Sequence, residues 1–213
     1  HNVAHSFPTR RSSDLDYAGV AMFAASGALM AAQKRQDVVA FIFFAAITGV
    51  GGGTLRDLLI DAPVFWVLDP GYVIVCTVVA VLVFLTRGRG IHEQGLLWLD
   101  AVGLCVYAVV GAAKALSLGV HPVICVVMGA LTATFGGIIR DVLAGEPSIL
   151  LRRELYITPA TISASTFIVL RILGVDWAWA SAIAVVGGFI VRAGAIQWKW
   201  HMAAFEPPKA KDR

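Results

Sequence analysis

Two Arg-Asp pairs lie inside long apolar stretches of this chain, and each follows a cluster of glycines. Gly51, Gly52 and Gly53 precede Arg56-Asp57, and Gly136 and Gly137 precede Arg140-Asp141. Charged side chains within a membrane are costly, so they mark either an ion path or an ion pair that holds the fold. Each glycine weakens a helix by about 1 kcal/mol relative to alanine. The pattern predicts a polar path through a membrane. It has no catalytic triad, phosphate loop or spaced metal ligands, so we expect no enzyme, cofactor or metal site.

The two motifs are copies of each other, related by one constant offset of 84 residues without a gap. Such self-similarity indicates a fold built from repeated units. The offset also relates these pairs: Asp16 and Asp100, Gly19 and Gly103, Gly27 and Gly111, Thr48 and Thr132, Pro63 and Pro147, Tyr72 and Tyr156. We predict one repeat at 16–90 and a second at 95–174.

The composition indicates an integral membrane protein. Of 213 residues, 58% are hydrophobic and 15% are charged, and the mean hydropathy is +0.78. Soluble domains are about 45–50% apolar and about 25% charged. The basic residues are dispersed rather than interleaved with aromatic residues, which excludes a nucleic-acid surface. The three cysteines stand singly in apolar runs and serve as small apolar side chains.

The hydropathy pattern predicts an all-α membrane protein with seven transmembrane helices, since a spanning helix needs about 20 apolar residues. The expected helices are 16–33, 38–60, 71–87, 95–117, 120–144, 156–174 and 178–198. Three helices in each repeat is an odd number, so the two repeats must cross the membrane in opposite senses. The seventh helix, 178–198, lies outside the duplication. Residues 16–200 then form one transmembrane domain.

Loop charges predict the orientation. The loops 61–70, 118–121 and 175–177 contain no Lys or Arg, whereas the loops at the other end and the tail 201–213 carry most of the basic residues. The positive-inside rule places the basic end in the cytoplasm. We therefore expect a protein of the inner (plasma) membrane with a cytoplasmic C-terminus and its N-terminus outside.

The first fifteen residues have a different character. Residues 6–15 resemble the translation of a sequencing adapter, and no apolar signal-peptide core is present. We expect residues 1–15 to be non-native and to lie outside the fold.

The charged pairs need partners. Adjacent residues on a helix do not face each other, so we expect the partners of Arg56 and Arg140 to come from other segments. Residues at the same depth are the best candidates. These are Asp16 for Arg56 and Asp100 for Arg140. The charges either neutralise each other and lock the fold, or flank a narrow polar path from both ends, with Asp57 and Asp141 beside it.

The glycine clusters allow two interpretations. Gly51 lies about 20 Å along its helix, inside an apolar core of about 30 Å. Broken helices persist in a bilayer where they line a water-filled cavity, and we expect such a break at Gly51–Gly53 and at Gly136–Gly137. The alternative is close helix packing. A face with Gly19, Phe23 and Gly27, repeated at 103, 107 and 111, favours packing between helices or between protomers.

Lys114 has no charged counterpart, because the equivalent position is Met30. It either extends to the interface or points into the path as a positive gate. Arg171 and Arg192 lie near helix ends, where we expect them to reach the interface.

These motifs together resemble the prokaryotic trimeric intracellular cation (TRIC) channels. The similarity runs from about 16 to 200. It rests on Asp16-Tyr17-Ala18-Gly19, Ser26-Gly27-Ala28, Gly51-Gly52-Gly53-Thr54-Leu55-Arg56-Asp57, Pro63-Val64-Phe65-Trp66 and Gly136-Gly137-Ile138-Ile139-Arg140-Asp141. The resemblance implies seven helices in two inverted repeats plus a seventh, and a homotrimer. It also implies a pore in each protomer, permeable to monovalent cations such as K⁺, near the kinked second and fifth helices. Phe135 replaces the third glycine of the second cluster, so the fifth helix is expected to bend less.

Two functions follow from these features. The first is a passive cation channel, in which helix breaks expose carbonyl dipoles to the ion and the arginines are neutralised by pairing. The alternative is a secondary transporter of a small zwitterion such as glycine, which is also a label of this domain. Its carboxylate would lie at half-helix N-termini. The expected partners are the permeating cations, the lipid bilayer and two further copies of the chain.

Overall fold

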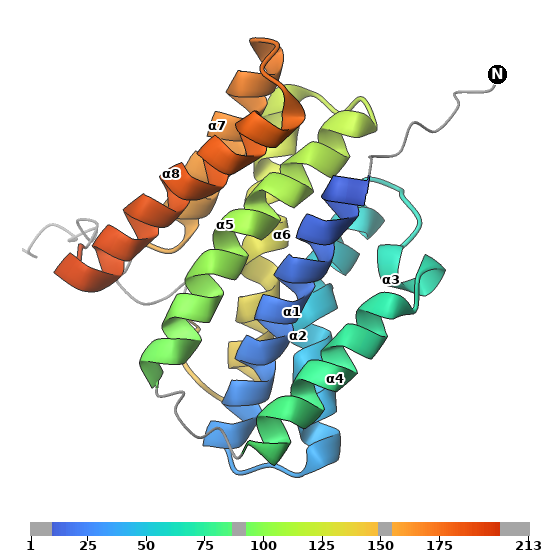
Figure 1. Cartoon of the computed structure of the whole chain (residues 1–213), viewed down its shortest axis with the longest axis vertical. Coiled ribbons are helices and arrows are strands. Elements are labelled where there is room, and N and C mark those ends of the chain that lie inside the picture. Colours follow the sequence, from blue (N-terminus) through green and yellow to red (C-terminus); the bar gives the residue numbers. More distant parts are fainter. Residues whose placement is uncertain (1–9, 87–92, 149–154, 201–213) are drawn as a thin grey trace, which may run out of the picture.

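The computed structural model describes residues 10–86, 93–148 and 155–200, and within these residues the fold is all-helical. Within these three ranges, seven long helices and one short helix follow each other (Figure 1). They are α1 (Arg10–Gln33), α2 (Val38–Leu59), α3 (Phe65–Leu68), α4 (Gly71–Leu85), α5 (Glu93–Ser117), α6 (Pro122–Leu143), α7 (Ile157–Ile172) and α8 (Trp177–Trp198). The predicted fold class is confirmed: a bundle of seven long helices, with α3 as an extra turn.

The start of α1 differs most from the expected helix bounds, and the other long helices differ by at most two residues at either end. Helix α1 begins at Arg10, because no Pro or Gly interrupts the chain between that residue and Asp16. Helices α4 and α7 have 15 and 16 residues and are shorter than the other five long helices, each of which is long and apolar enough to span a membrane. Helix α7 ends before Gly174, which has a positive φ of 79° that favours glycine.

The duplication extends to the backbone hydrogen bonds of the turns. After α1, Arg35 N–H donates to Ala32 O and Gln36 N–H to Ala31 O, and after α5 the equivalent Gly119 and Val120 donate to Leu116 and Ala115. Arg35 and Gly119 both have positive φ, of 53° and 75°. The two copies therefore end their first helix with the same turn.

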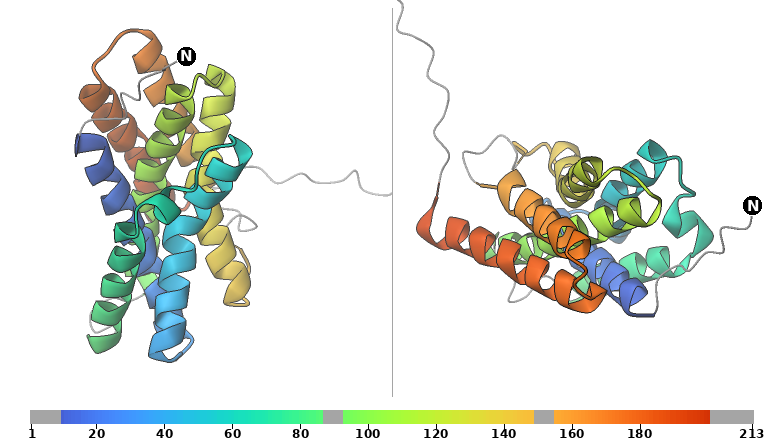
Figure 2. Two further views of the ribbon diagram at one scale, coloured as in Figure 1. Left: turned by 90° about the vertical axis from the view of Figure 1, so that its right-hand side faces the viewer. Right: turned by 90° about the horizontal axis from the view of Figure 1, so that it is seen from above.

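The two repeats pack against each other through their first and second helices. Helix α1 contacts α5, and α2 contacts α6, while α4 packs on α1 and α2, and α7 on α5 and α6. Figure 2 shows α8 on the side of the bundle away from α4, where it covers α5 and α7. A pseudo-two-fold axis between the repeats places the duplicated motifs at opposite ends of the bundle.

The contact between α1 and α5 contains the same interaction twice, once from each helix to the other. The rings of Phe23 and Tyr107 lie edge to face, with centroids 5.2 Å apart. Each ring covers the glycine of the other helix, Tyr107 at Gly19 and Phe23 at Gly103, where a Cβ would meet the ring. The Tyr107 hydroxyl donates to Gly49 O at 3.2 Å. The predicted glycine–aromatic face therefore packs between helices of one chain.

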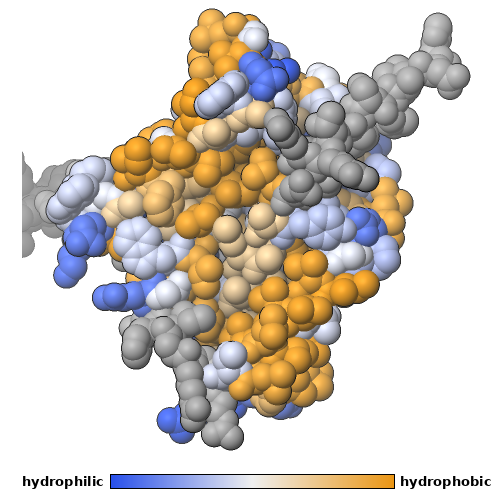
Figure 3. All heavy atoms as spheres, viewed as in Figure 1, coloured by the Kyte–Doolittle hydropathy of each residue, from blue (hydrophilic) through white to orange (hydrophobic). Residues whose placement is uncertain are grey.

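The outer surface of the bundle is apolar. Apolar side chains cover much of the face seen in Figure 3, with hydrophilic residues mainly toward its edges. Exposed examples are Ile74, Val78, Leu82 and Leu85 on α4 and Ile183, Val186 and Ile190 on α8. Such a surface suits lipid contact. The three cysteines, Cys76, Cys105 and Cys125, are buried and free, as expected.

Candidate functional site

The first charge cluster consists of Arg56, Asp57 and Lys114. Arg56 Nη2 lies 2.8 Å from Asp57 Oδ1, and Lys114 Nζ on α5 lies 2.8 Å from the same carboxylate. Arg56 and Asp57 are fully buried, while Lys114 keeps 15% of its side-chain surface. The expectation that adjacent residues cannot pair is wrong here, because the long arginine side chain folds back onto the neighbouring carboxylate.

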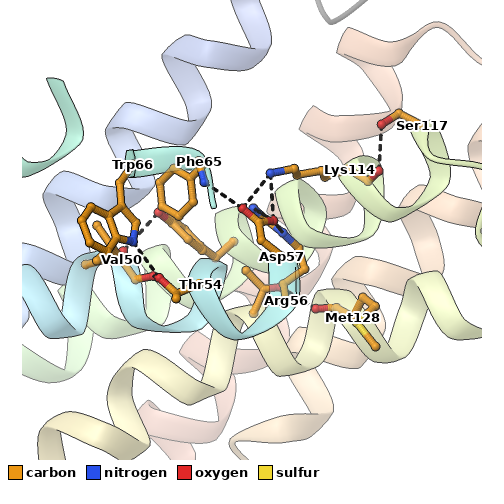
Figure 4. Close-up of polar contacts among 12 residues, drawn as sticks. Val50, Thr54, Arg56, Asp57, Phe65, Trp66, Lys114, Ser117 and Met128 are labelled. Carbon is orange, nitrogen blue, oxygen red and sulfur yellow. Dashed lines mark hydrogen bonds and ion pairs between the residues drawn. The ribbon is translucent and has the colours of Figure 1, made fainter. Parts of the chain in front are cut away.

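The first charge cluster also holds the short helix α3. Asp57 Oδ2 accepts the backbone N–H of Phe65 at 3.0 Å, and the Phe65 ring centroid lies 5.8 Å from both Arg56 and Lys114. The Trp66 indole N–H donates to Thr54 Oγ1 at 2.8 Å. Figure 4 shows Lys114 reaching Asp57 beside Phe65, with Trp66 directed at Thr54. Helix α3 is thereby fastened across the end of α2.

An aromatic group extends this arrangement toward the loop before α4. Tyr17 stacks on Tyr72 with centroids 4.2 Å apart, and Tyr72 meets Phe65 edge to face at 4.7 Å. The Tyr17 hydroxyl donates to Asp69 Oδ2 at 2.6 Å. This bond, with the N–H of Gly71, lowers the pKa of the exposed Asp69 carboxyl from its usual value. Asp69 therefore remains charged near this end of the bundle.

Asp16 is not the partner of Arg56. Within the described residues Asp16 forms no ion pair, and the carboxylate that pairs with Arg56 is that of Asp57, which also binds Lys114. Lys114 comes from the other repeat, where its position corresponds to Met30. The sequence flagged Lys114 as unmatched. It does not simply extend to the interface, because its ammonium group is bound to Asp57.

The second charge cluster consists of Asp100, Arg140 and Asp141, at the opposite end of the bundle. Arg140 Nη1 lies 2.9 Å from Asp100 Oδ1, and Nη2 lies 2.8 Å from Asp141 Oδ1. The expected Asp100–Arg140 pair is confirmed. Arg140 also donates to the hydroxyl of Ser26, which reaches the cluster from repeat one. All four side chains are buried.

Ser26 and Arg192 are residues whose part in the second charge cluster and its surroundings we did not predict. Ser26 stands where repeat two has Val110, so the loss of symmetry was a usable signal. Arg192 was expected at the interface but is fully buried. Its guanidinium donates to Leu155 O at 2.8 Å and lies 5.3 Å from the Tyr156 ring centroid. Its four-residue spacing from Gly188 on the buried face of α8 was the available signal.

The glycine clusters mark the crossing of α2 and α6. Both helices continue without interruption through their glycines, so the expected break in the helices is wrong. A Cβ on Gly52 would collide with the carbonyl oxygen of Thr132, and a Cβ on Gly136 with that of Thr48. The two contacts are equivalent under the duplication, because Gly52 corresponds to Gly136 and Thr132 corresponds to Thr48. The close approach of two backbones explains these two glycines.

Of the remaining glycines, Gly53 and Gly137 make room for side chains beside the two charge clusters. A Cβ on Gly53 would lie 2.6 Å from the Phe65 ring. A Cβ on Gly137 would lie 2.6 Å from the Tyr156 hydroxyl and 3.4 Å from Asp100 Oδ1. Gly51 is less confined, with Ile139 as the neighbour at 3.2 Å. Two of these three glycines thus make room for the residues that line the charge clusters.

The arrangement neutralises buried charge toward both ends of the bundle. Arg56 and Arg140 are each bound by the aspartate that follows them, and each charge cluster is contacted by one residue of the other repeat: Lys114 binds Asp57, and Ser26 accepts from Arg140. In the part of the chain with described side chains, no group of three His, Cys, Asp or Glu residues is placed to hold a metal ion.

Comparison with known proteins gives matches over most of the chain. A family model described as "Glycine transporter" matches residues 14–88 and again 97–171. The UPF0126 inner membrane protein YadS of Escherichia coli (strain K12) is 38% identical over 195 residues, which cover 90% of this chain and 94% of that protein. A UPF0126 membrane protein of Vibrio cholerae is 35% identical over 194 residues, 90% of this chain and 81% of that protein.

Solved structures are similar over the same region. The TRIC trimeric intracellular cation channel orthologue from Rhodobacter sphaeroides superposes with a TM-score of 0.87 at 44% identity, covering 90% of this chain and all of that one. A prokaryotic TRIC channel in 0.5 M KCl gives a TM-score of 0.81 at 27% identity, with 90% and 98% covered.

Proposed function

The chain belongs to the family of the prokaryotic trimeric intracellular cation (TRIC) channels, and we propose that it is a passive channel for monovalent cations such as K⁺. The pore runs within each chain, beside α2 and α6 and between the first and second charge clusters. Three copies assemble in the inner membrane, with the N-terminus outside and the C-terminus in the cytoplasm. The similarity to TRIC channels supports cation conduction, and the basic loops support the orientation.

The pairing of Arg56 and Arg140 with the aspartates that follow them is the observation that carries this proposal. An unpaired arginine beside a pore would repel cations, but Asp57 neutralises Arg56 and Asp141 neutralises Arg140. The second charge cluster has one more carboxylate than arginine, because Asp100 also contacts Arg140. Rings and clusters of carboxylates favour cations in channels.

The alternative is a secondary transporter of a small zwitterion such as glycine, which the description of the family model favours. A transporter of this kind holds the carboxylate of its substrate at the N-terminal ends of broken helices. Helices α2 and α6 are continuous through their glycines and offer no such ends at mid-bundle. The channel is therefore the better supported function.

Recording from purified protein in planar bilayers tests the proposal. We expect unitary currents in symmetric KCl and a reversal potential that follows the K⁺ gradient. Saturable uptake of labelled glycine by proteoliposomes, in the absence of unitary currents, would instead establish the transporter.

Lys114→Met tests whether Lys114 acts as a positive gate. Methionine is the residue at the equivalent position of repeat one. The change removes a cation from the first charge cluster while Arg56 still pairs with Asp57. We expect about fivefold higher unitary K⁺ conductance at low salt, the equivalent of about 1 kcal/mol of repulsion. The difference should shrink in 1 M salt, where the Debye length is about 3 Å.

Lys34→Met is the matched control, because Lys34 also binds a carboxylate, Glu146, at 2.6 Å but lies at the other end of the bundle. Equal changes in conductance for both variants would indicate a general surface-charge effect and remove Lys114 from the path.

A further inference from the structure

A pocket of about 470 Å³ opens between the α1–α2 turn and the end of α4. Arg35 and Gln36 provide its polar side, and Phe41, Phe84 and Leu85 its apolar side. The side chains of Phe84 and Leu85 are 38% and 70% exposed, so the apolar side continues onto the outer surface of α4. The pocket therefore presents a cation next to a surface suited to hydrocarbon.

Arg35 occupies a backbone position that normally belongs to glycine. Its φ is 53°, in the left-handed region that side chains with a Cβ disfavour. The duplication provides the comparison, because the same turn after α5 has Gly119 at the equivalent position with φ 75°. The residue with positive φ at the end of an α-helix is commonly glycine. Repeat one thus keeps an arginine at a conformational cost that repeat two avoids.

The guanidinium of Arg35 is available to a ligand. Among the described residues it takes part in no hydrogen bond or ion pair, whereas the adjacent Lys34 is bound to Glu146 at 2.6 Å. The side chain of Arg35 is exposed and lines the pocket. The turn after α1 therefore differs from the turn after α5 in having an arginine at the pocket mouth whose guanidinium is unpaired among the described residues.

We propose that this pocket binds the headgroup of an anionic phospholipid. The phosphate lies against Arg35, and an acyl chain lies along Phe84 and Leu85. Basic pockets at the ends of transmembrane helices are suited to anionic headgroups. The apolar side and the position at the end of α4 favour a lipid over a free anion, since the exposed residues of α4 toward this end are apolar, Val78, Leu82 and Leu85 among them. The inference does not depend on the conducted ion.

Native mass spectrometry of the full chain in detergent tests the site by counting retained phosphatidylglycerol and phosphatidylcholine with identical acyl chains. Arg35→Gly is the informative variant, because Gly119 shows that the turn accepts glycine. Wild type should retain phosphatidylglycerol in preference to phosphatidylcholine. Arg35→Gly should weaken the retention of phosphatidylglycerol roughly fivefold, the effect of one basic residue near an anionic headgroup, and leave phosphatidylcholine unchanged.

Lys199→Gly is the matched control. Lys199 is basic and exposed, has a φ of 51° at the end of α8, and lies outside the pocket. This variant should retain phosphatidylglycerol as wild type does. Equal losses in the two variants would reduce the effect to general surface charge. The absence of any phosphatidylglycerol preference in wild type would overturn the site. If inorganic phosphate at equal concentration displaced phosphatidylglycerol, the pocket would be a site for free anions and not for a lipid.

Discussion

Arg140→Ala is expected to destabilise the protein by about 3–5 kcal/mol, the usual effect of removing one partner from a buried ion pair. Arg140 is 2% exposed and is the cation between Asp100 and Asp141, which are 1% and 4% exposed. Without it, two carboxylates would remain close together in a region of low polarity, and Ser26 would lose its donor. The expected result is a large fall in the thermal unfolding temperature in detergent, or failure to accumulate in the membrane.

Two further variants make this prediction specific. Arg171→Ala removes an arginine near the end of α7 that donates to Val175 O at 2.6 Å, and we expect a loss of about 1 kcal/mol. Combining Arg140→Ala with Asp100→Asn and Asp141→Asn removes the two carboxylate charges that Arg140 pairs with and should restore much of the stability. If the combined variant were no more stable than Arg140→Ala, the loss would come from packing and not from charge.

Arg56 should be less sensitive than Arg140, although the duplication makes them equivalent. Asp57 retains Lys114 at 2.8 Å and the N–H of Phe65 at 3.0 Å when Arg56 is removed. The difference between the two arginines was not predictable from the repeat, because Lys114 is a residue that breaks the repeat. Symmetry in the sequence therefore predicts where charges lie but not how each is compensated.

The helices and the duplication could be predicted because they depend on information along one chain segment. Apolar length sets the number of helices, and depth along a helix follows from its rise per residue. Depth in the membrane was enough to predict the ion pair between Asp100 and Arg140. It was insufficient for Asp16, because the partner of Arg56 depends on which helix lies alongside and on the rotation of each helix about its axis. Those quantities are set by the packing of α2 against α1, α4 and α6, and of α5 against α1 and α6.

The glycine clusters show the same limit. A run of glycines is compatible with a break in a helix and with close contact between helices, and the residues alone do not distinguish the two. The distinction required knowing that α2 meets α6 where Gly52 faces Thr132 and Gly136 faces Thr48. Packing of the two backbones is the interpretation that the structure supports for these two positions.

Gly52→Ala and Gly136→Ala should each lower stability by about 1–3 kcal/mol, the usual effect of overpacking. The new Cβ would collide with a backbone carbonyl oxygen, which cannot move aside as a flexible side chain does. Alanine is otherwise the better helix former by about 1 kcal/mol, so propensity alone predicts the opposite sign. The sign of the change therefore decides between packing and local helix weakness.

Gly187→Ala is the matched control, because a Cβ there meets no atom within 4 Å. It should leave the unfolding temperature unchanged or raise it. Since Gly52 and Gly136 lie at one crossing, a shift that separates α2 from α6 relieves both contacts, and the double variant should be less destabilised than the sum of the single variants. Stabilisation by Gly52→Ala would mean that α2 and α6 do not approach as closely as described. The pore proposed beside their crossing would then lose its structural basis.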